Sequence, residues 1–376
     1  MFKEMRPEGV NAPRGEERNI KRNTVVVEID PENIDYEKLA FCAEVIKQGG
    51  LVCFPTETVY GLGANAFDPV AVDAIFEAKG RPHDNPLIVH IDGYGMLDLV
   101  AAGREDEMDR LYRLGQKYWP GPLTIIVTRD SAVPDSVSCG LPSVGIRMPE
   151  SLIARELIRL SGVPIAAPSA NLSGRPSPST AQHVIQDLFG RVDVIISGGD
   201  ARVGVESTVL DVTGPVPTIL RPGAVTLADV ESVLGSGDLP DWRIPAAEGE
   251  KPKSPGMKYT HYSPDADVTI FDGGTAAVRD RIARETFCLK EGKCGVLTTD
   301  GGESFYKEKA KAGTVVLSLG SRDNMLSLTH NLFSRLREFD ALGVTAVFAE
   351  AVPATGIGNA VMNRLYRAAG GKVISC

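Results

Sequence analysis

A short segment in the first quarter of the chain gathers side chains that bind anions in proteins. The segment KGRPHDNPLIVH, residues 79–90, carries two cations, an amide and a terminal histidine: Lys79, Arg81, Asn85 and His90. The chain as a whole is acidic, with a formal net charge of −9, so this group of cations is unusual. The side chains lie either in a solvated turn or against an anionic ligand held by charge-assisted hydrogen bonds.

Further polar clusters follow apolar, strand-like runs. They occur in FPTETVYGLG, LPSVGIRMP, PIAAPSANLSGRPSPS, VESTV and LRPG, and contain Thr58, Ser143, Arg147, Ser169, Asn171, Ser177, Ser207 and Arg221. Each cluster alone is also compatible with an ordinary loop, and His90 with a satisfied core histidine. In a buried strand, however, Arg147 needs an anionic partner. Because loops that rise from one sheet usually converge on one site, the clusters together predict an anion pocket with hydroxyl and amide donors.

Residues 24–235 contain the elements that must position these side chains. Short runs rich in β-branched residues predict strands within 24–30, 50–55, 86–91, 122–128, 143–149, 163–169, 192–199 and 207–213. Helices are predicted near 36–48 and 179–189, the second with a capping box made by Ser179 and Gln182. This alternation predicts an α/β domain with a large mixed sheet.

The second part of the chain has a different texture. Residues 236–264 are rich in Gly, Pro, Lys and Glu and are too long for an ordinary loop, which predicts a linker. Beyond it, strands and helices are predicted in strict alternation at 268–272, 275–289, 294–300, 303–311, 314–319, 322–340, 344–350 and 358–369. They predict a smaller, Rossmann-like domain with a parallel sheet over 265–376. The segment TGIGNAV (355–361) lacks a third glycine and predicts a loop or helix start rather than a dinucleotide site.

Several classes of site are not indicated. The six cysteines form no CxxC pair and the five histidines are widely spaced, so no zinc site is expected. No apolar stretch reaches the roughly 18 residues of a membrane span. The polar segment 1–23 lacks an apolar signal core and is expected to be a flexible tail, which together with free thiols favours a cytoplasmic location.

The motifs together resemble one family. PTETVYGLG, KGRPxxNPL, the SxN of Ser169 and Asn171, and the ESTV–LRPG pair resemble YrdC-type L-threonylcarbamoyladenylate synthases. The linker SPGMKYTHYSP and the trailing domain resemble their long, two-domain form. The resemblance implies a YrdC-like twisted mixed-sheet domain with a concave site. It also implies a nucleotidyltransferase that makes threonylcarbamoyl-AMP and pyrophosphate from L-threonine, bicarbonate or CO₂, and ATP, the first step of tRNA threonylcarbamoyladenosine modification beside the anticodon.

The resemblance also implies roles for individual residues. The signature tetrad would be Lys79, Arg81, Ser169 and Asn171. Threonine would contact Thr58, His90, Arg147, the backbone at Ala167, and Ser207. ATP would contact Arg81, Asn85, Ser143, Ser169, Ser177 and Arg221, with His261 and Tyr262 of the linker closing over the nucleotide. Mg²⁺ would be held mainly by the ATP phosphates, since no carboxylate cage is evident. The threonine hydroxyl could meet Thr58, His90 or Ser207, and no residue stands out as a general base.

Three alternatives remain at this stage. An RNA-binding module could use the cationic pocket, but the acidic chain predicts weak or absent direct tRNA binding. A carbamoyl-transfer enzyme of the hydrogenase-maturation type would add zinc-finger cysteines and further large domains. The trailing domain could also be a separate partner-binding module. The expected partners are the three substrates and a downstream tRNA threonylcarbamoyl transferase complex, without a membrane.

Overall fold

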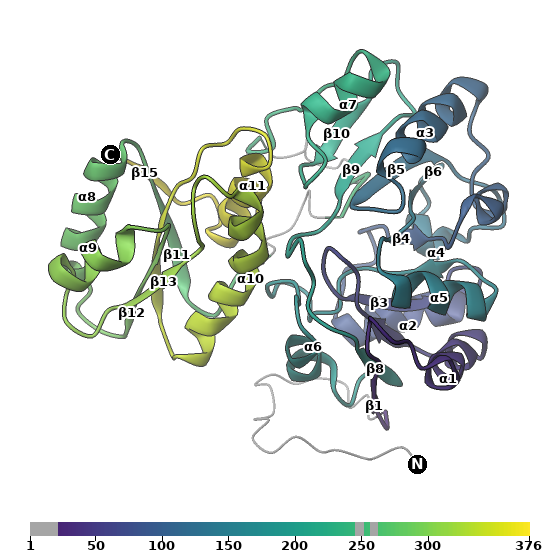
Figure 1. The fold of residues 1–376 in the computed structure, drawn as a ribbon, viewed down its shortest axis with the longest axis horizontal. Helices are drawn as coiled ribbons and strands as arrows, with labels where there is room; N and C mark the ends of the chain where they lie inside the picture. The colour runs from purple at the N-terminus through teal and green to yellow at the C-terminus, as the bar shows by residue number, and fades with distance from the viewer. Residues whose placement is uncertain (1–21, 245–251, 256–261) are drawn as a thin grey trace.

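The computed structural model describes residues 22–244, 252–255 and 262–376, and within these ranges the strands form two sheets (Figure 1). The first sheet has the order β1-β8-β2-β3-β7-β4-β6-β5-β9-β10. Its strands are β1 (Val25–Glu28), β2 (Val52–Phe54), β3 (Gly61–Asn65), β4 (Ile88–His90), β5 (Leu123–Thr128), β6 (Ser143–Arg147), β7 (Ile165–Ala166), β8 (Val194–Ser197), β9 (Thr208–Asp211) and β10 (Thr218–Arg221). Parallel pairs such as β4–β6 and antiparallel pairs such as β5–β6 occur in it, which confirms the predicted mixed sheet.

Two strands of this sheet, β3 and β10, lie outside the predicted runs. β3 reads GLGAN and contains no β-branched residue, so its sequence lacks the usual strand signal. Its glycines have a packing reason. A Cβ on Gly63 would lie 2.6 Å from Ile165 and 2.7 Å from the Phe54 ring, so only glycine permits this close approach of the strand.

The helices of the first unit pack on both sides of the sheet (Figure 1). They are α1 (Tyr36–Lys47), α2 (Pro69–Lys79), α3 (Glu105–Tyr118), α4 (Asp135–Ser138), α5 (Leu152–Ser161), α6 (Ala181–Leu188) and α7 (Leu227–Leu234), with a 3₁₀ turn at Tyr94–Leu99. The predicted cap of α6 was wrong by one residue. Thr180, in extended backbone conformation, caps the helix by accepting from the His183 N–H at 3.2 Å. Ser179 instead lies 2.9 Å from the Ser334 hydroxyl of the second unit.

The second sheet is parallel throughout, in the order β13-β12-β14-β11-β15. Its strands are β11 (Asp267–Asp272), β12 (Cys294–Thr298), β13 (Val315–Ser318), β14 (Ala346–Glu350) and β15 (Val373–Ser375). The helices are α8 (Thr275–Cys288), α9 (Gly302–Lys309), α10 (Met325–Ala341) and α11 (Gly358–Ala368). The predicted parallel α/β domain is confirmed, and TGIGNAV is a helix start. Because β14 lies between β12 and β11, the strand order differs from that of a dinucleotide-binding fold.

The two units share an apolar core across their boundary. Helices α10 and α11 face the first unit, whereas α8 and α9 lie on the far side of the sheet (Figure 1). Val59 and Val205 of the first unit belong to the same buried cluster as Phe333 of α10. Gly204 approaches α10 so closely that a Cβ would lie 2.4 Å from the His330 Cα. The second unit therefore packs directly on the loops of the first.

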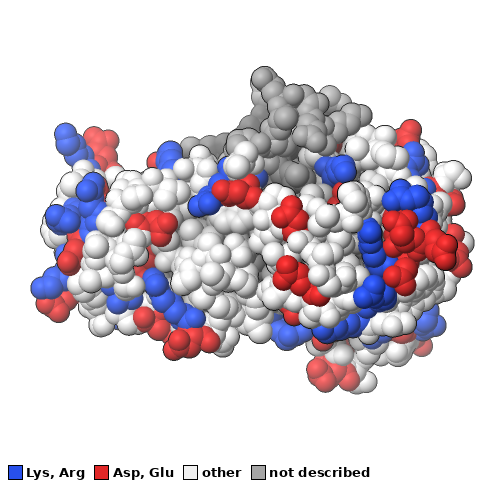
Figure 2. All heavy atoms as spheres, turned by 90° about the horizontal axis from the view of Figure 1, so that it is seen from above, with Lys and Arg blue, Asp and Glu red and all other residues white. Residues whose placement is uncertain are grey.

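Several predicted segments lie partly or wholly outside the described residues. These are 1–21 of the predicted N-terminal tail, and 245–251 and 256–261 of the predicted linker, including His261. Arg22 already donates its backbone N–H to the Gly190 carbonyl at 2.8 Å. No helix within the described ranges is both long and apolar enough to cross a membrane. On the face shown in Figure 2, basic side chains are interspersed with acidic ones over both units.

Candidate functional site

A hollow in the first unit collects most of the predicted site residues. It encloses about 710 Å³, including the part open to solvent. Its walls come from the segment after β2, the end of α2, strands β4 and β6, the loop after β7, the residues just before β9, and the end of β10. The predicted residues that line it are Thr58, Lys79, Arg81, His90, Arg147, Ala167, Ser169, Asn171, Ser177, Ser207, Arg221 and Tyr262.

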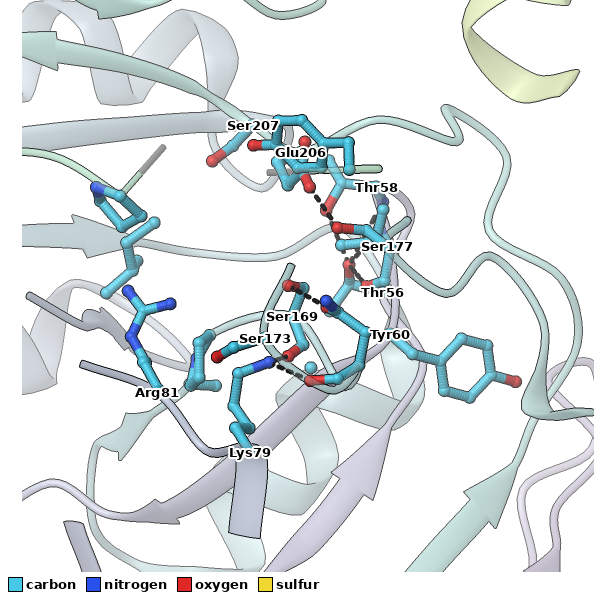
Figure 3. A pocket seen from close by; sticks show the side chains of 18 of the residues that line it. Thr56, Thr58, Tyr60, Lys79, Arg81, Ser169, Ser173, Ser177, Glu206 and Ser207 are labelled. Atoms are coloured by element: carbon cyan, nitrogen blue, oxygen red, sulfur yellow. Dashed lines mark hydrogen bonds between the residues drawn. The ribbon is translucent and has the colours of Figure 1, made fainter. Parts of the chain in front are cut away.

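Lys79 joins the two parts of the signature tetrad. It is the last residue of α2, which ends at Gly80 in left-handed conformation (φ 61°), and only 2% of it is exposed. Its Nζ donates to the backbone carbonyls of Ser169 and Asn171, while the Ser169 hydroxyl donates to the Asn171 Oδ1 at 2.5 Å (Figure 3). Burial, followed by the charge of Arg81, lowers the pKa of Lys79 to about 7. An anion in the hollow would favour its charged form.

Arg81 is held against the loop that precedes β4. Its Nε donates to the Asn85 carbonyl at 3.2 Å and its Nη2 to the Pro86 carbonyl at 3.1 Å. Burial lowers the pKa of Arg81 to about 10, so the guanidinium stays charged at neutral pH. The loop thus fixes a permanent cation in the wall of the hollow.

Arg147 and His90 lie side by side because β4 and β6 pair in parallel with these two residues in register. Arg147 is buried, and its Nη2 donates to Glu57 Oε1 at 2.7 Å. Glu57 is thus the anionic partner that a buried Arg147 requires, and the sequence analysis did not identify it. Burial, followed by the charge of Arg147, lowers the pKa of His90 to about 3, so its imidazole is neutral at physiological pH.

The wall of the hollow that contains Arg221 and Ser207 holds a second polar network. Arg221 donates from Nη2 to the Ser207 hydroxyl and from Nε to the Ser207 carbonyl, both at 3.1 Å. The Ser177 hydroxyl donates to Glu206 Oε1 (Figure 3). Burial raises the pKa of Glu206, but the charges of Arg364 and Arg221 outweigh it, and the pKa is lowered overall. Like Glu57, Glu206 is marked by no local sequence pattern, since its partners lie far away in the chain.

Ser143 and Asn85 are predicted residues that do not line the hollow. In an extended strand, the four-residue separation of Ser143 from Arg147 places them on one face but about 13 Å apart. Ser143 lines a neighbouring cavity that shares Ile88 and Pro255 with the hollow. The Asn85 side chain is buried beside Arg81, and its Oδ1 has no hydrogen-bond partner among the described residues.

The charge balance of the lining favours an anionic ligand. The described residues that line the hollow include one carboxylate, Glu206, against five cations: Lys79, Arg81, Arg147, Arg175 and Arg221. In the part of the chain that the structure describes, no cluster of three or more His, Cys, Asp or Glu residues could bind a metal ion.

Comparisons with known proteins give a consistent result. A family model described as "Telomere recombination" matches residues 44–223, and one described as "Threonylcarbamoyl-AMP synthase, C-terminal domain" matches residues 225–370. The threonylcarbamoyl-AMP synthase of Pyrococcus abyssi is 44% identical over 360 residues, which cover 93% of this chain and 99% of the relative. That of Bacillus subtilis is 44% identical, covering 90% of this chain and 94% of the relative. The crystal structure of P. abyssi Sua5 complexed with L-threonine matches with a TM-score of 0.86 and 42% identity, covering 94% of this chain and 99% of the other.

Proposed function

The chain belongs to the threonylcarbamoyl-AMP synthase family, and from this premise we propose that the hollow converts L-threonine, bicarbonate or CO₂, and ATP into threonylcarbamoyl-AMP and pyrophosphate. The observation that carries the proposal is the convergence of Lys79, Arg81, Arg147 and Arg221 in the hollow. Two anions, a carbamate and a triphosphate, must approach each other for this reaction. Preorganised cations offset their repulsion, as in other phosphoryl-type transfers.

Threonine would occupy the side of the hollow formed by β4 and β6. The Arg147 guanidinium would pair with the threonine carboxylate, held in place by Glu57 and by the Gly121 carbonyl, which accepts from Nε at 3.3 Å. A neutral His90 can offer a hydrogen bond without adding charge. The threonine hydroxyl would meet Thr58, His90 or Ser207, and a site that hydrogen-bonds this group can reject valine by about four orders of magnitude.

The reaction would then proceed in two steps. The threonine ammonium first releases a proton to water, and the neutral amine adds to the carbon of CO₂ while one C=O π bond opens. Release of a second N–H proton to water leaves the carbamate. A carbamate oxygen attacks the α-phosphorus of ATP, a new P–O bond forms, and the bond to pyrophosphate breaks. Lys79 and Arg81 would neutralise charge on the phosphates, with Arg221 and Ser177 on the nucleotide side. Mg²⁺ bound to the ATP phosphates would supply further charge neutralisation.

The product, a mixed anhydride, would be consumed by a tRNA threonylcarbamoyl transferase complex in the cytoplasm. The alternatives are less well supported. The acidic chain, with a formal net charge of −9, disfavours an RNA-binding module, and on the face shown in Figure 2 basic side chains are interspersed with acidic ones. A relative of nearly equal length carries the synthase name, which favours this reaction over carbamoyl transfer in hydrogenase maturation.

Pyrophosphate release tests the assignment. Wild-type protein should release pyrophosphate when all three substrates are present, and Lys79→Ala and Arg81→Ala should reduce this rate by roughly a hundredfold or more. Lys47→Ala, which removes an exposed cation on α1, is the matched control and should retain the wild-type rate. Wild-type rates in the Lys79 and Arg81 variants would refute the assignment.

A further inference from the structure

A fully buried arginine of the second unit binds the wall of the hollow. Arg364 belongs to α11 and is 0% exposed. Its Nε donates to Glu206 Oε2 at 3.0 Å, its Nη2 to the Glu206 carbonyl at 3.2 Å, and its Nη1 to the Pro222 carbonyl. All three nitrogens therefore reach across the boundary between the two units.

Glu206 connects this arginine to the hollow. Its Oε1 accepts a hydrogen bond from the Ser177 hydroxyl, while its Oε2 accepts one from the Arg364 Nε. A serine hydroxyl has a single proton to donate, so the Ser177 oxygen can offer only acceptor lone pairs to a ligand. Both Glu206 and Ser177 line the hollow. The orientation of a pocket hydroxyl thus depends on a side chain from the other unit.

A second arginine of the trailing unit holds the same loop. Arg337 of α10 donates to both carboxylate oxygens of Asp187, at 3.2 and 2.7 Å, and to the Pro176 carbonyl at 2.5 Å. Asp187 also accepts from the Leu172 N–H at 3.3 Å. The segment between Asn171 and Ser177 is therefore attached to α10 next to the point where Ser177 meets Glu206.

We propose that Arg364 is a positioning residue of the reaction, which fixes the Glu206 carboxylate from the second unit and thereby orients Ser177 in the nucleotide side of the hollow. This inference rests on the proposed function for the identity of the nucleotide. It assigns a role to the second unit: the hollow is complete only when α11 and α10 are docked. A free partner-binding module would not need buried arginines in this position.

The charges around Glu206 give the inference a pH signature. Glu206 faces Arg364 from α11, Arg221 from β10, Lys79 from α2, and the Tyr262 ring. Loss of Arg364 removes the largest charge effect that lowers the Glu206 pKa, so this carboxylate should take up a proton at a higher pH. Protonated Glu206 would no longer accept the hydrogen bond that orients the Ser177 hydroxyl. The acid limb of ATP binding, which is the pH range in which affinity falls on acidification, should therefore move to higher pH.

Calorimetric titration with ATP and magnesium chloride tests the proposal without turnover. Arg364→Met should weaken ATP binding by about tenfold or more and raise the acid limb, while threonine binding changes little. Arg364→Lys should restore part of the affinity. The double variant Arg364→Met/Glu206→Gln should also bind ATP weakly. The pH dependence of its ATP affinity should not show the shifted acid limb, because the titrating Glu206 carboxylate is gone. If the single methionine variant does not fold, the lysine and double variants carry the test.

Arg335→Met is the matched control, since Arg335 lies on α10 but contacts Ser318 and Glu338 of its own unit. It should bind ATP like the wild type. Wild-type ATP affinity and an unchanged acid limb in folded Arg364 variants would overturn the proposal. A wild-type protein that binds ATP but releases no pyrophosphate would instead count against the proposed function, and the two failures are thus distinguishable.

Discussion

Replacing Arg147 with methionine should weaken both the fold and the binding of threonine. The side chains of Arg147 and Glu57 are only 5% and 4% exposed, and their charged atoms lie 2.7 Å apart. Without Arg147, the Glu57 carboxylate keeps the Glu150 N–H at 2.9 Å as a partner but loses its compensating charge. Breaking a buried ion pair from one side costs about 3–5 kcal/mol. At about 2–4 °C per kcal/mol for a domain of this size, Tm should fall by about 6–20 °C.

Threonine affinity should fall for a separate reason. A hydrogen bond to a charged group is worth about 1.5–3 kcal/mol. Since about 1.4 kcal/mol corresponds to a tenfold change, loss of the contact with the threonine carboxylate should weaken binding by about 10- to 150-fold. Thermal unfolding and calorimetric titration with L-threonine measure the two effects independently.

The double variant Arg147→Met/Glu57→Gln separates these effects. It removes the unpaired buried charge, so its Tm should return toward the wild-type value, while threonine binding stays weak. Arg202→Met is a control, because Arg202 pairs with Glu150 on the surface, where ion pairs contribute about 0–1 kcal/mol. Wild-type threonine affinity in the double variant would refute the reasoning.

Two further predictions concern Lys79 and the boundary between the units. Because burial lowers the pKa of Lys79 to about 7, the folded protein releases this proton before the unfolded chain does, and the stability contributed by this group rises as pH increases above 7. Binding of ATP at about pH 8 should therefore take up a proton, visible in buffers of different ionisation enthalpy and lost in Lys79→Met; equal heats in all buffers would contradict this. Gly204→Ala should lower the free energy of unfolding more than Gly235→Ala. Both glycines have positive φ (79° and 77°), but an added Cβ would meet the His330 backbone at Gly204, 2.4 Å from the Cα, and no described atom within 4 Å at Gly235. Equal decreases in the free energy of unfolding for both variants, measured by urea unfolding, would exclude a role of the close packing between Gly204 and α10.

Local signals in the sequence were sufficient for much of the fold. Each predicted strand run overlaps an observed strand, because β-branched residues in short apolar runs suit a buried sheet. Strand β3 was not predicted, because its glycines permit close packing against Phe54 and have low strand propensity. The insertion of β14 between β12 and β11 also had no local signal, since strand order is decided by tertiary packing.

The site shows the same limit. The resemblance to the family implied that Lys79 and the Ser169–Asn171 pair belong together, and they do contact each other. The partners Glu57 and Arg364 were missed because each is defined by a contact with a residue far away in the chain. Ser143 shares a strand with Arg147, but the rise of the strand carries it beyond the hollow.

Mass analysis of the product after incubation with ATP, L-threonine and isotopically labelled bicarbonate tests the central claim most directly. If the cationic hollow joins the carbamate of threonine to the α-phosphate, a mixed anhydride of threonylcarbamate and AMP will appear, with one labelled carbon. It should be absent when threonine is omitted and in Lys79→Ala. ATP consumption without a labelled anhydride, or equal amounts of the anhydride in Lys79→Ala, would contradict the account.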